Sequence, residues 1–290
     1  CRDQRLWSAG ETGTLSREDS DVSRQGRETD PVERMAGRVR ESGPEVVVFI
    51  HGLGASRDAF EPAFEDPGLR GYTLASLDLP GFGESPPADD VSRTMTDMAR
   101  LVIRWLEPLD AERVHIVGHS MGGVVGLCAA ELLGSRAGAL LSLEGNLGID
   151  DCVFSGKIAS LPLDAFERHG FPVFCGMLRN LLEKDPSPGL ERYCRDLDRA
   201  DPATLHRCAR SLVRESAEGR LRDRFLGLSL HKAYFGGEKS LPSRNRAFLT
   251  RHGIPCHVVE GSGHFMMDDR PDLFWPMLAK TLGEGALHRA

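Results

Sequence analysis

The fold is decided by the stretch Val114-His115-Ile116-Val117-Gly118-His119-Ser120-Met121-Gly122. Residues 114–117 predict a strand and residues 124–133 predict a helix, so Ser120 falls in a short turn between the two. Glycine on either side of the turn removes side chains that would collide with the strand and the helix. The stretch therefore predicts an exposed serine hydroxyl at the start of a helix, beside the backbone N–H of Met121.

Further strands and helices are predicted on both sides of this turn. Apolar, β-branched runs predict strands at 46–50, 72–77, 140–143, 233–235 and 256–259, with a short one near 37–40. Apolar residues at three- and four-residue spacing predict helices at 92–107, 243–251 and 271–282. Alternating strands and helices predict an α/β fold with a mostly parallel, doubly wound sheet, because parallel strands need crossover helices.

The pattern changes twice along the chain. Residues 1–42 are polar and predict a flexible leader. Between residues 150 and 230 the strand pattern disappears, and helical patterns alternate with Pro- and Gly-containing breaks. We therefore expect a core made of residues 43–149 and 231–290, with residues 150–230 inserted as a helical unit.

Composition narrows the classes of partner. A net charge of −7 disfavours nucleic acid, so a small and largely uncharged molecule is the expected substrate. No run approaches the roughly 18 apolar residues of a membrane span. Seven cysteines without a CxxC pair predict reduced thiols and a cytoplasmic protein, with a lipid-anchored form through Cys1 as the minor alternative. We expect a monomer or homodimer with no cofactor and no metal.

A serine hydroxyl needs a base and an oxyanion site before it can act as a nucleophile. The segment His51-Gly52-Leu53-Gly54 follows the predicted strand 46–50 and offers the N–H of Leu53 as a second oxyanion donor, beside that of Met121. Near the other end of the chain, Gly261-Ser262-Gly263-His264 follows the last predicted strand. Ser120 is thus the candidate nucleophile, and the chain has ten histidines from which its base could come.

These segments, together with the loop at residues 78–85, resemble the α/β-hydrolase fold family over roughly residues 45–282. The resemblance implies that the base is the last member of the triad, on the loop after the final long strand, and this position is His264. It implies also that the acid lies between Ser120 and His264 in the chain, and that His51 shapes the oxyanion loop. It also implies that the helical insertion is a cap over the nucleophile. Candidate pocket residues in this cap are Phe154, Phe171, Phe174 and Met177, although a stripe at helical spacing also fits a packing face.

The acid has two candidates. Members of the family commonly carry an Asp in the turn after the cap, where this chain has Ser240. A serine cannot form an ionic hydrogen bond with an imidazolium, so Glu238 in that turn or Glu144 must take the role. We favour Glu144, which ends the predicted strand 140–143, as in branches resembling zearalenone lactonases or some haloalkane dehalogenases.

The predicted activity is hydrolysis of an ester, lactone or thioester through an acyl-enzyme. A C–C bond hydrolase, or another cofactor-free Ser-His enzyme of the same fold, is one alternative. A non-hydrolytic receptor for a small ligand is an alternative of a different class, because a fold does not fix a function.

Overall fold

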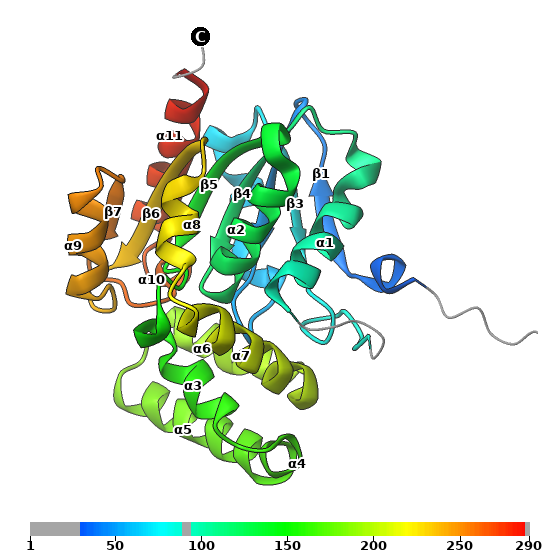
Figure 1. Cartoon of the computed structure of the whole chain (residues 1–290), viewed down its shortest axis with the longest axis vertical. Coiled ribbons are helices and arrows are strands. Elements are labelled where there is room, and N and C mark those ends of the chain that lie inside the picture. Colours follow the sequence, from blue (N-terminus) through cyan, green and yellow to red (C-terminus); the bar gives the residue numbers. More distant parts are fainter. Residues whose placement is uncertain (1–29, 89–93, 288–290) are drawn as a thin grey trace, which may run out of the picture.

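Seven strands form a single sheet in the computed structural model, which describes residues 30–88 and 94–287 (Figure 1). The strand order is β1-β3-β2-β4-β5-β6-β7, and every neighbouring pair is parallel except β1 with β3. The strands are β1 (Gly37–Arg40), β2 (Glu45–Ile50), β3 (Thr73–Leu77), β4 (Arg113–His119), β5 (Ala137–Leu143), β6 (His231–Gly237) and β7 (Cys256–Val259). The predicted fold class is confirmed, and each strand lies at or near its predicted position.

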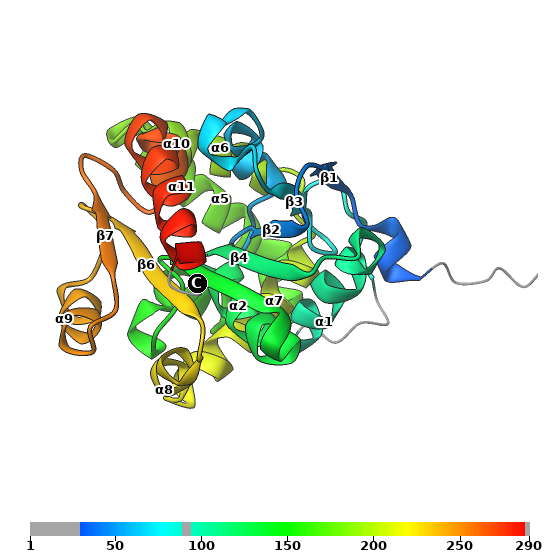
Figure 2. The same cartoon turned by 90° about the horizontal axis from the view of Figure 1, so that it is seen from above.

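Helices cover both faces of the sheet (Figure 2). One face carries α1 (Met95–Leu106), α2 (Met121–Leu133), α8 (Leu221–Gly227) and α9 (Ser243–Arg251). The other carries α10 (Met266–Asp269), α11 (Pro271–Leu287) and the 3-10 segment η2 (Arg57–Glu65). Of the helix predicted at 92–107, the first two residues lie outside the described part of the chain.

The core consists of two apolar clusters, one on each face of the sheet. Strand β2 contributes to both clusters, because side chains alternate along a strand. Val46, Val48 and Ile50 face the α1–α2 side, whereas Val47 and Phe49 face the α11 side. All five are almost fully buried, which explains the uninterrupted apolar run in the sequence.

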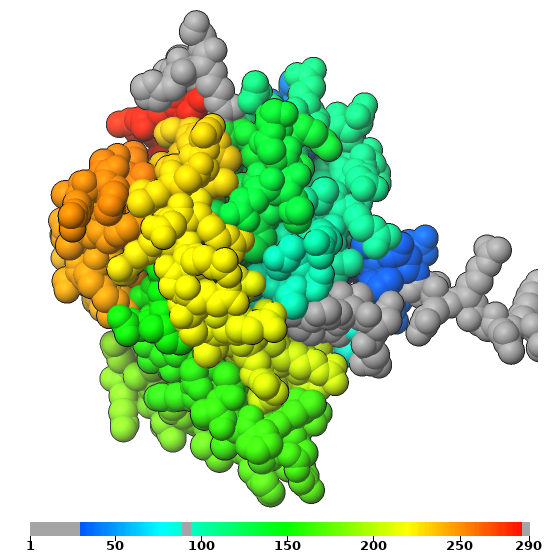
Figure 3. All heavy atoms as spheres, viewed as in Figure 1, coloured from blue at the N-terminus to red at the C-terminus, as the bar shows by residue number. Residues whose placement is uncertain are grey.

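The segment between β5 and α8, which the sequence predicts to be a cap and which keeps that name below, contains α3 (Val153–Ala159), α4 (Leu163–Ala165), α5 (Phe171–Lys184), α6 (Pro188–Leu197) and α7 (Pro202–Ala217). Figure 3 shows its green segment as a lobe below the core, joined to the core by the yellow segment. Helix α8, which falls within the stretch predicted as an insertion, packs against α2 in the core. There Arg224 of α8 forms an ion pair with Glu131 of α2.

The segment predicted as a leader is only partly described. Residues 1–29, including Cys1, lie outside the described residues. Residues 37–40 form β1 at the edge of the sheet, as the short strand predicted there. No described helix has the length and apolar content needed to cross a membrane. The six cysteines of the described ranges are free thiols.

Candidate active site

Ser120 occupies a strained turn between β4 and α2. Its backbone has φ 52° and ψ −117°, a conformation that residues with a Cβ rarely adopt. A Cβ at Gly118 would lie 2.2 Å from the carbonyl oxygen of Gly122, and one at Gly122 would lie 2.1 Å from that of Ile50. The turn is therefore possible only with glycine at both places, and Met121 begins α2 with an N–H that has no partner within the helix.

The loop after β2 is held beside this turn by His51. Its Nδ1–H donates to the carbonyl of Gly52 at 2.8 Å, while its Nε2 accepts the N–H of Leu79 at 2.9 Å. Burial lowers the pKa of His51, which favours this neutral form. Because the Gly52 carbonyl and the Leu53 N–H belong to one peptide group, the same hydrogen bond fixes the direction of the Leu53 N–H.

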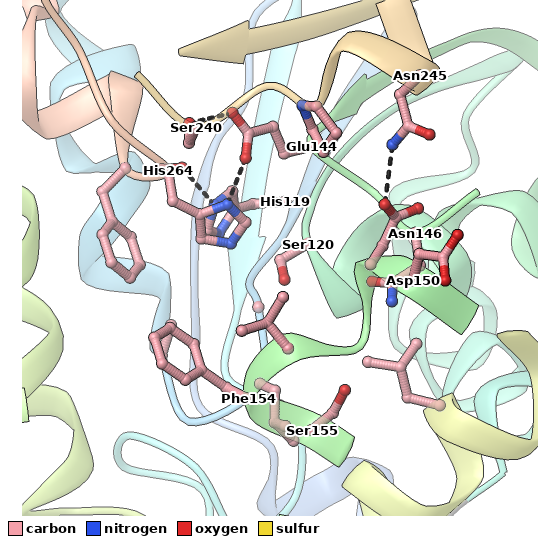
Figure 4. Close-up of a pocket in the computed structure, with 18 of the residues that line it drawn as sticks. His119, Ser120, Glu144, Asn146, Asp150, Phe154, Ser155, Ser240, Asn245 and His264 are labelled. Carbon is pink, nitrogen blue, oxygen red and sulfur yellow. Dashed lines mark hydrogen bonds and ion pairs between the residues drawn. The ribbon is translucent and has the colours of Figure 1, made fainter. Parts of the chain in front are cut away.

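His264 is paired with Glu144 at the end of β5 (Figure 4). Nδ1 of His264 lies 2.6 Å from Oε2 of Glu144. The other carboxylate oxygen accepts the N–H of Gly237 at 2.8 Å and the hydroxyl of Ser240 at 2.5 Å. Burial works to raise the pKa of Glu144, but His264 and these hydrogen bonds outweigh it and lower that pKa. Glu144 is thus held as a carboxylate.

The alternative acid, Glu238, lies elsewhere. Its carboxylate accepts the N–H of Gly261 at 3.0 Å on an exposed part of the surface. Ser240 stands where members of the family commonly have an Asp, and its hydroxyl donates a hydrogen bond to Glu144. Its hydroxyl therefore supports the carboxylate supplied by β5.

We expect Ser240→Ala to lower kcat/KM about three- to tenfold, because it removes one hydrogen bond to a charged group that orients His264. It should also raise the pKa of Glu144 toward its usual range. A carboxylate whose pKa is lowered on folding stabilises the protein above its unfolded pKa, and this contribution is lost as the pH falls through the folded pKa. Because the difference between the folded and unfolded pKa values is then smaller, the thermal unfolding temperature should fall less between pH 7 and pH 3 in the variant than in the parent.

The exposed Ser243→Ala, three residues away, is the control for this change and should match the parent in both measurements. A Ser240→Ala protein with an unchanged pH dependence of unfolding would contradict the assigned hydrogen bond.

His119 is a neutral support for the loop that carries His264. Its Nε2–H donates to the backbone carbonyl of His264 at 2.9 Å, and the two ring centroids are 4.7 Å apart. Burial, followed by the nearby His264, holds the pKa of His119 well below its usual value. A neutral ring that donates to the backbone in this way orients the loop that carries His264.

A cavity of about 270 Å³ brings these groups together. Its lining includes Ser120, Glu144, His264, Leu53 and Phe154. Within the described residues the Ser120 hydroxyl forms no hydrogen bond to His264, and such bonds often tighten only when substrate binds. The remaining predicted pocket residues, Phe171, Phe174 and Met177, are not in the lining; Phe174 packs on Phe154, with ring centroids 5.9 Å apart.

Several lining residues were not predicted from the sequence. Asn146 and Phe265 each lie within two residues of a predicted site residue, and that proximity was the available signal. Ser155 and Tyr193 come from the cap and had no comparable local signal.

Helix α6 of the cap is joined to both loops of the site. The Tyr193 hydroxyl donates to the carbonyl of Leu53 at 2.9 Å, and burial raises the pKa of Tyr193, which keeps it a neutral donor. Arg192 binds both carboxylate oxygens of Asp268, at 2.8 and 3.0 Å, four residues after His264. Arg192 also pairs with the buried Asp196 on its own helix. One helix of the cap, α6, therefore contacts both the loop after β2 and the loop that carries His264.

Replacement of Arg192 by methionine should lower the free energy of unfolding by about 3 kcal/mol, since it leaves the half-buried Asp268 without its cation and the buried Asp196 with Arg199 as its remaining cation. Urea unfolding measures this change. Arg195→Met on the same helix is the matched control, because Arg195 pairs with Glu191 in solvent and should cost about 0.5 kcal/mol or less. Equal losses in the two variants would contradict the role given to the buried network.

A family model described as the alpha/beta hydrolase family matches residues 47–276. The dihydrolipoyllysine-residue acetyltransferase component of the acetoin cleaving system from Cupriavidus necator is 37% identical over 249 residues, which are 83% of this chain and 64% of that relative. The chain thus spans less than two thirds of the length of that relative.

Two solved structures show the same fold. A thermophilic esterase from Thermogutta terrifontis is 20% identical, with a TM-score of 0.72 over 87% of this chain and 93% of that one. An esterase from Exiguobacterium antarcticum is 21% identical, with a TM-score of 0.71 over 86% and 95%. The family match covers most of the chain. The chain therefore belongs to the alpha/beta hydrolase family.

Proposed function

We propose that this protein is a serine hydrolase that cleaves an ester, lactone or thioester of a small, largely apolar molecule through an acyl-enzyme at Ser120. One observation carries the proposal. The Ser120 hydroxyl, the His264–Glu144 pair and the Leu53 backbone all border a single cavity of about 270 Å³. A cavity of this size suits a small substrate.

Each group has a role in the proposed reaction. Ser120 Oγ attacks the carbonyl carbon while Nε2 of His264 takes the hydroxyl proton, and Glu144 holds the imidazolium through Nδ1. The N–H groups of Leu53 and Met121 stabilise the oxyanion. His264 then gives the proton to the leaving alcohol or thiol. In the second half, water loses a proton to Nε2 of His264 and attacks the acyl carbon. The bond from that carbon to Ser120 Oγ then breaks, the acid leaves, and His264 returns the proton to Oγ.

The acyl-enzyme can be tested by adding methanol, which competes with water for the acyl group on Ser120. We expect esters of one acid with different leaving groups to give the same ratio of free acid to methyl ester, because all pass through one intermediate. Ratios that follow the leaving group would overturn the acyl-enzyme.

Turnover separates an enzyme from a receptor. A panel of p-nitrophenyl esters, lactones, thioesters and amides should yield many equivalents of product per protein. A fluorophosphonate probe should label the peptide that contains Ser120 and stop turnover. Labelling without turnover on any substrate of the panel would overturn hydrolysis and favour the receptor alternative. A cytoplasmic location and a monomeric or homodimeric state stay predictions.

A further inference from the structure

The cavity beside Ser120 has two unlike sides (Figure 4). Phe154 lies on one side of Ser120, and Asn146, Asp150 and Asn245 lie on the other. Leu53 and Phe265 add to the apolar lining, whereas Asp151, Ser155 and Arg244 add to the polar lining. A substrate that filled the cavity with hydrocarbon alone would leave the polar part of this lining unmatched.

Several polar side chains on this side of the cavity already have hydrogen-bond partners within the protein. Asp151 accepts the N–H groups of Leu147 and Gly148 with one carboxylate oxygen, and Arg244 and Asn245 with the other. The amide oxygen of Asn245 in turn accepts Arg222. These groups have found partners within the protein and form a rigid support.

Asn146 is the first exception. Asn146 is only 6% exposed. Within the described residues its side chain nevertheless makes a single hydrogen bond, which Nδ2 donates to the Sγ of Cys152 at 3.3 Å. Thiol sulfur is a weak acceptor, and the amide oxygen has no partner in the same ranges. Buried amides in folded proteins are normally paired, so an amide left free on a cavity wall is available to a ligand.

Ser155 is the second exception, and it comes from a different element. It lies on α3 of the cap and is 5% exposed, and its hydroxyl forms no hydrogen bond in the described parts of the chain. Core and cap thus each place one unpaired, neutral hydrogen-bonding group on the lining of the cavity.

The charges on the polar side disfavour an anion. Arg244 is the cation of this lining, and it is already 2.8 Å from Asp151 and 3.7 Å from Asp150. Glu144 adds another carboxylate to the same cavity. An anionic substituent would face three carboxylates and one cation that is already paired, whereas a neutral hydroxyl or carbonyl meets no such repulsion.

We propose that Asn146 and Ser155 select esters carrying a neutral hydroxyl or carbonyl substituent, which they bind by hydrogen bonds while Ser120 attacks the ester carbonyl. The proposal rests on the proposed function. A plain alkyl ester would leave both buried groups without water and without partners. Sites built to hydrogen-bond a substrate group reject analogues that lack it.

Matched ester pairs test the proposal on either side of the scissile bond. On the acyl side the pair is p-nitrophenyl 3-hydroxybutanoate and p-nitrophenyl butanoate; on the alcohol side it is 2-hydroxyethyl butanoate and propyl butanoate. We expect kcat/KM to favour the hydroxylated ester about 10- to 100-fold in at least one pair. Mono-p-nitrophenyl succinate, which carries a carboxylate, should be no better than the plain ester.

The variants Asn146→Leu and Ser155→Ala should each bring the preference ratio down at least about threefold. The ratio is measured within each variant, so a general loss of activity cancels. Alanine has a higher helix propensity than serine, so Ser155→Ala should fold and can test the proposal even if Asn146→Leu does not fold. Exposed Asn180→Leu and Ser160→Ala, whose hydroxyl donates to the Lys157 carbonyl, are the matched controls and should keep the parent ratio.

The outcomes separate this proposal from the proposed function. Equal hydrolysis of all neutral esters by the parent would overturn the selectivity alone, as would a preference that both variants retain. A marked preference for the succinate ester would overturn the argument from charge. Absence of hydrolysis of every ester would instead overturn the proposed function.

Discussion

Ser120→Ala is expected to lower the kcat for ester hydrolysis by about four to six orders of magnitude. The change removes the nucleophile and leaves only the oxyanion donors and the binding cavity, which retain a small part of the catalysis in such sites. Steady-state assays with p-nitrophenyl butanoate measure the loss. Ser76→Ala is the control, because Ser76 is a fully buried serine on β3, outside the cavity lining, with an unpaired hydroxyl.

A second replacement at this position separates chemistry from folding. Ser120→Gly should also abolish hydrolysis, but it should raise the free energy of unfolding by about 1 kcal/mol or more, because glycine adopts φ 52° without strain. A Ser120→Ala protein that hydrolysed the ester at the parent rate would disprove the role of the serine. Destabilisation by the glycine would show that the turn holds no strain.

Glu144→Gln is expected to lower kcat by about three to four orders of magnitude. The N–H of Gly237 and the hydroxyl of Ser240 both donate to one carboxylate oxygen, so the single oxygen of glutamine stays with them. The amide NH₂ then faces Nδ1 of His264 and forces the imidazole proton onto Nε2. That nitrogen can no longer accept the proton of Ser120.

Glu238→Gln is the matched control for this substitution. Its carboxylate binds only the N–H of Gly261 in the described structure, and we expect kcat to change by no more than about twofold. The two variants should be assayed over a pH series with the same ester. A large loss in Glu238→Gln with little change in Glu144→Gln would reverse the assignment of the acid.

The fold and the main residues of the site could be predicted because the sequence patterns that indicate them each span only a few neighbouring residues. The turn at Ser120 needs glycine on both sides and a strand before it, and these lie within a few residues of one another. Glu144 and His264 each follow a predicted strand, so a parallel sheet brings them to one edge. Topology therefore allowed this pairing, although 120 residues separate the two, but it also allowed Glu238, which follows the strand predicted at 233–235.

The supporting contacts could not be predicted in the same way. In the sequence, Ser240 was notable only because it stands where the family commonly has an acid. Its hydrogen bond to Glu144 depends on how two loops that are distant in the chain pack together. The ion pair between Arg192 and Asp268 joins a cap helix to a core loop, and nothing within either segment specifies the other. Phe171 and Phe174 had the same helical spacing as Phe154, and only packing determines which ring reaches the cavity.

The buried contacts of α6 also affect whether the cap can be exchanged between related proteins. Arg192 and Tyr193 are completed by groups of the core, at Asp268 and at Leu53. A chimera that received this cap on a foreign core would bury a guanidinium and a phenol without these partners, at a cost of several kcal/mol. We therefore expect an exchanged cap to keep its stability only when the loop after β2 and the loop that carries His264 are transferred with it.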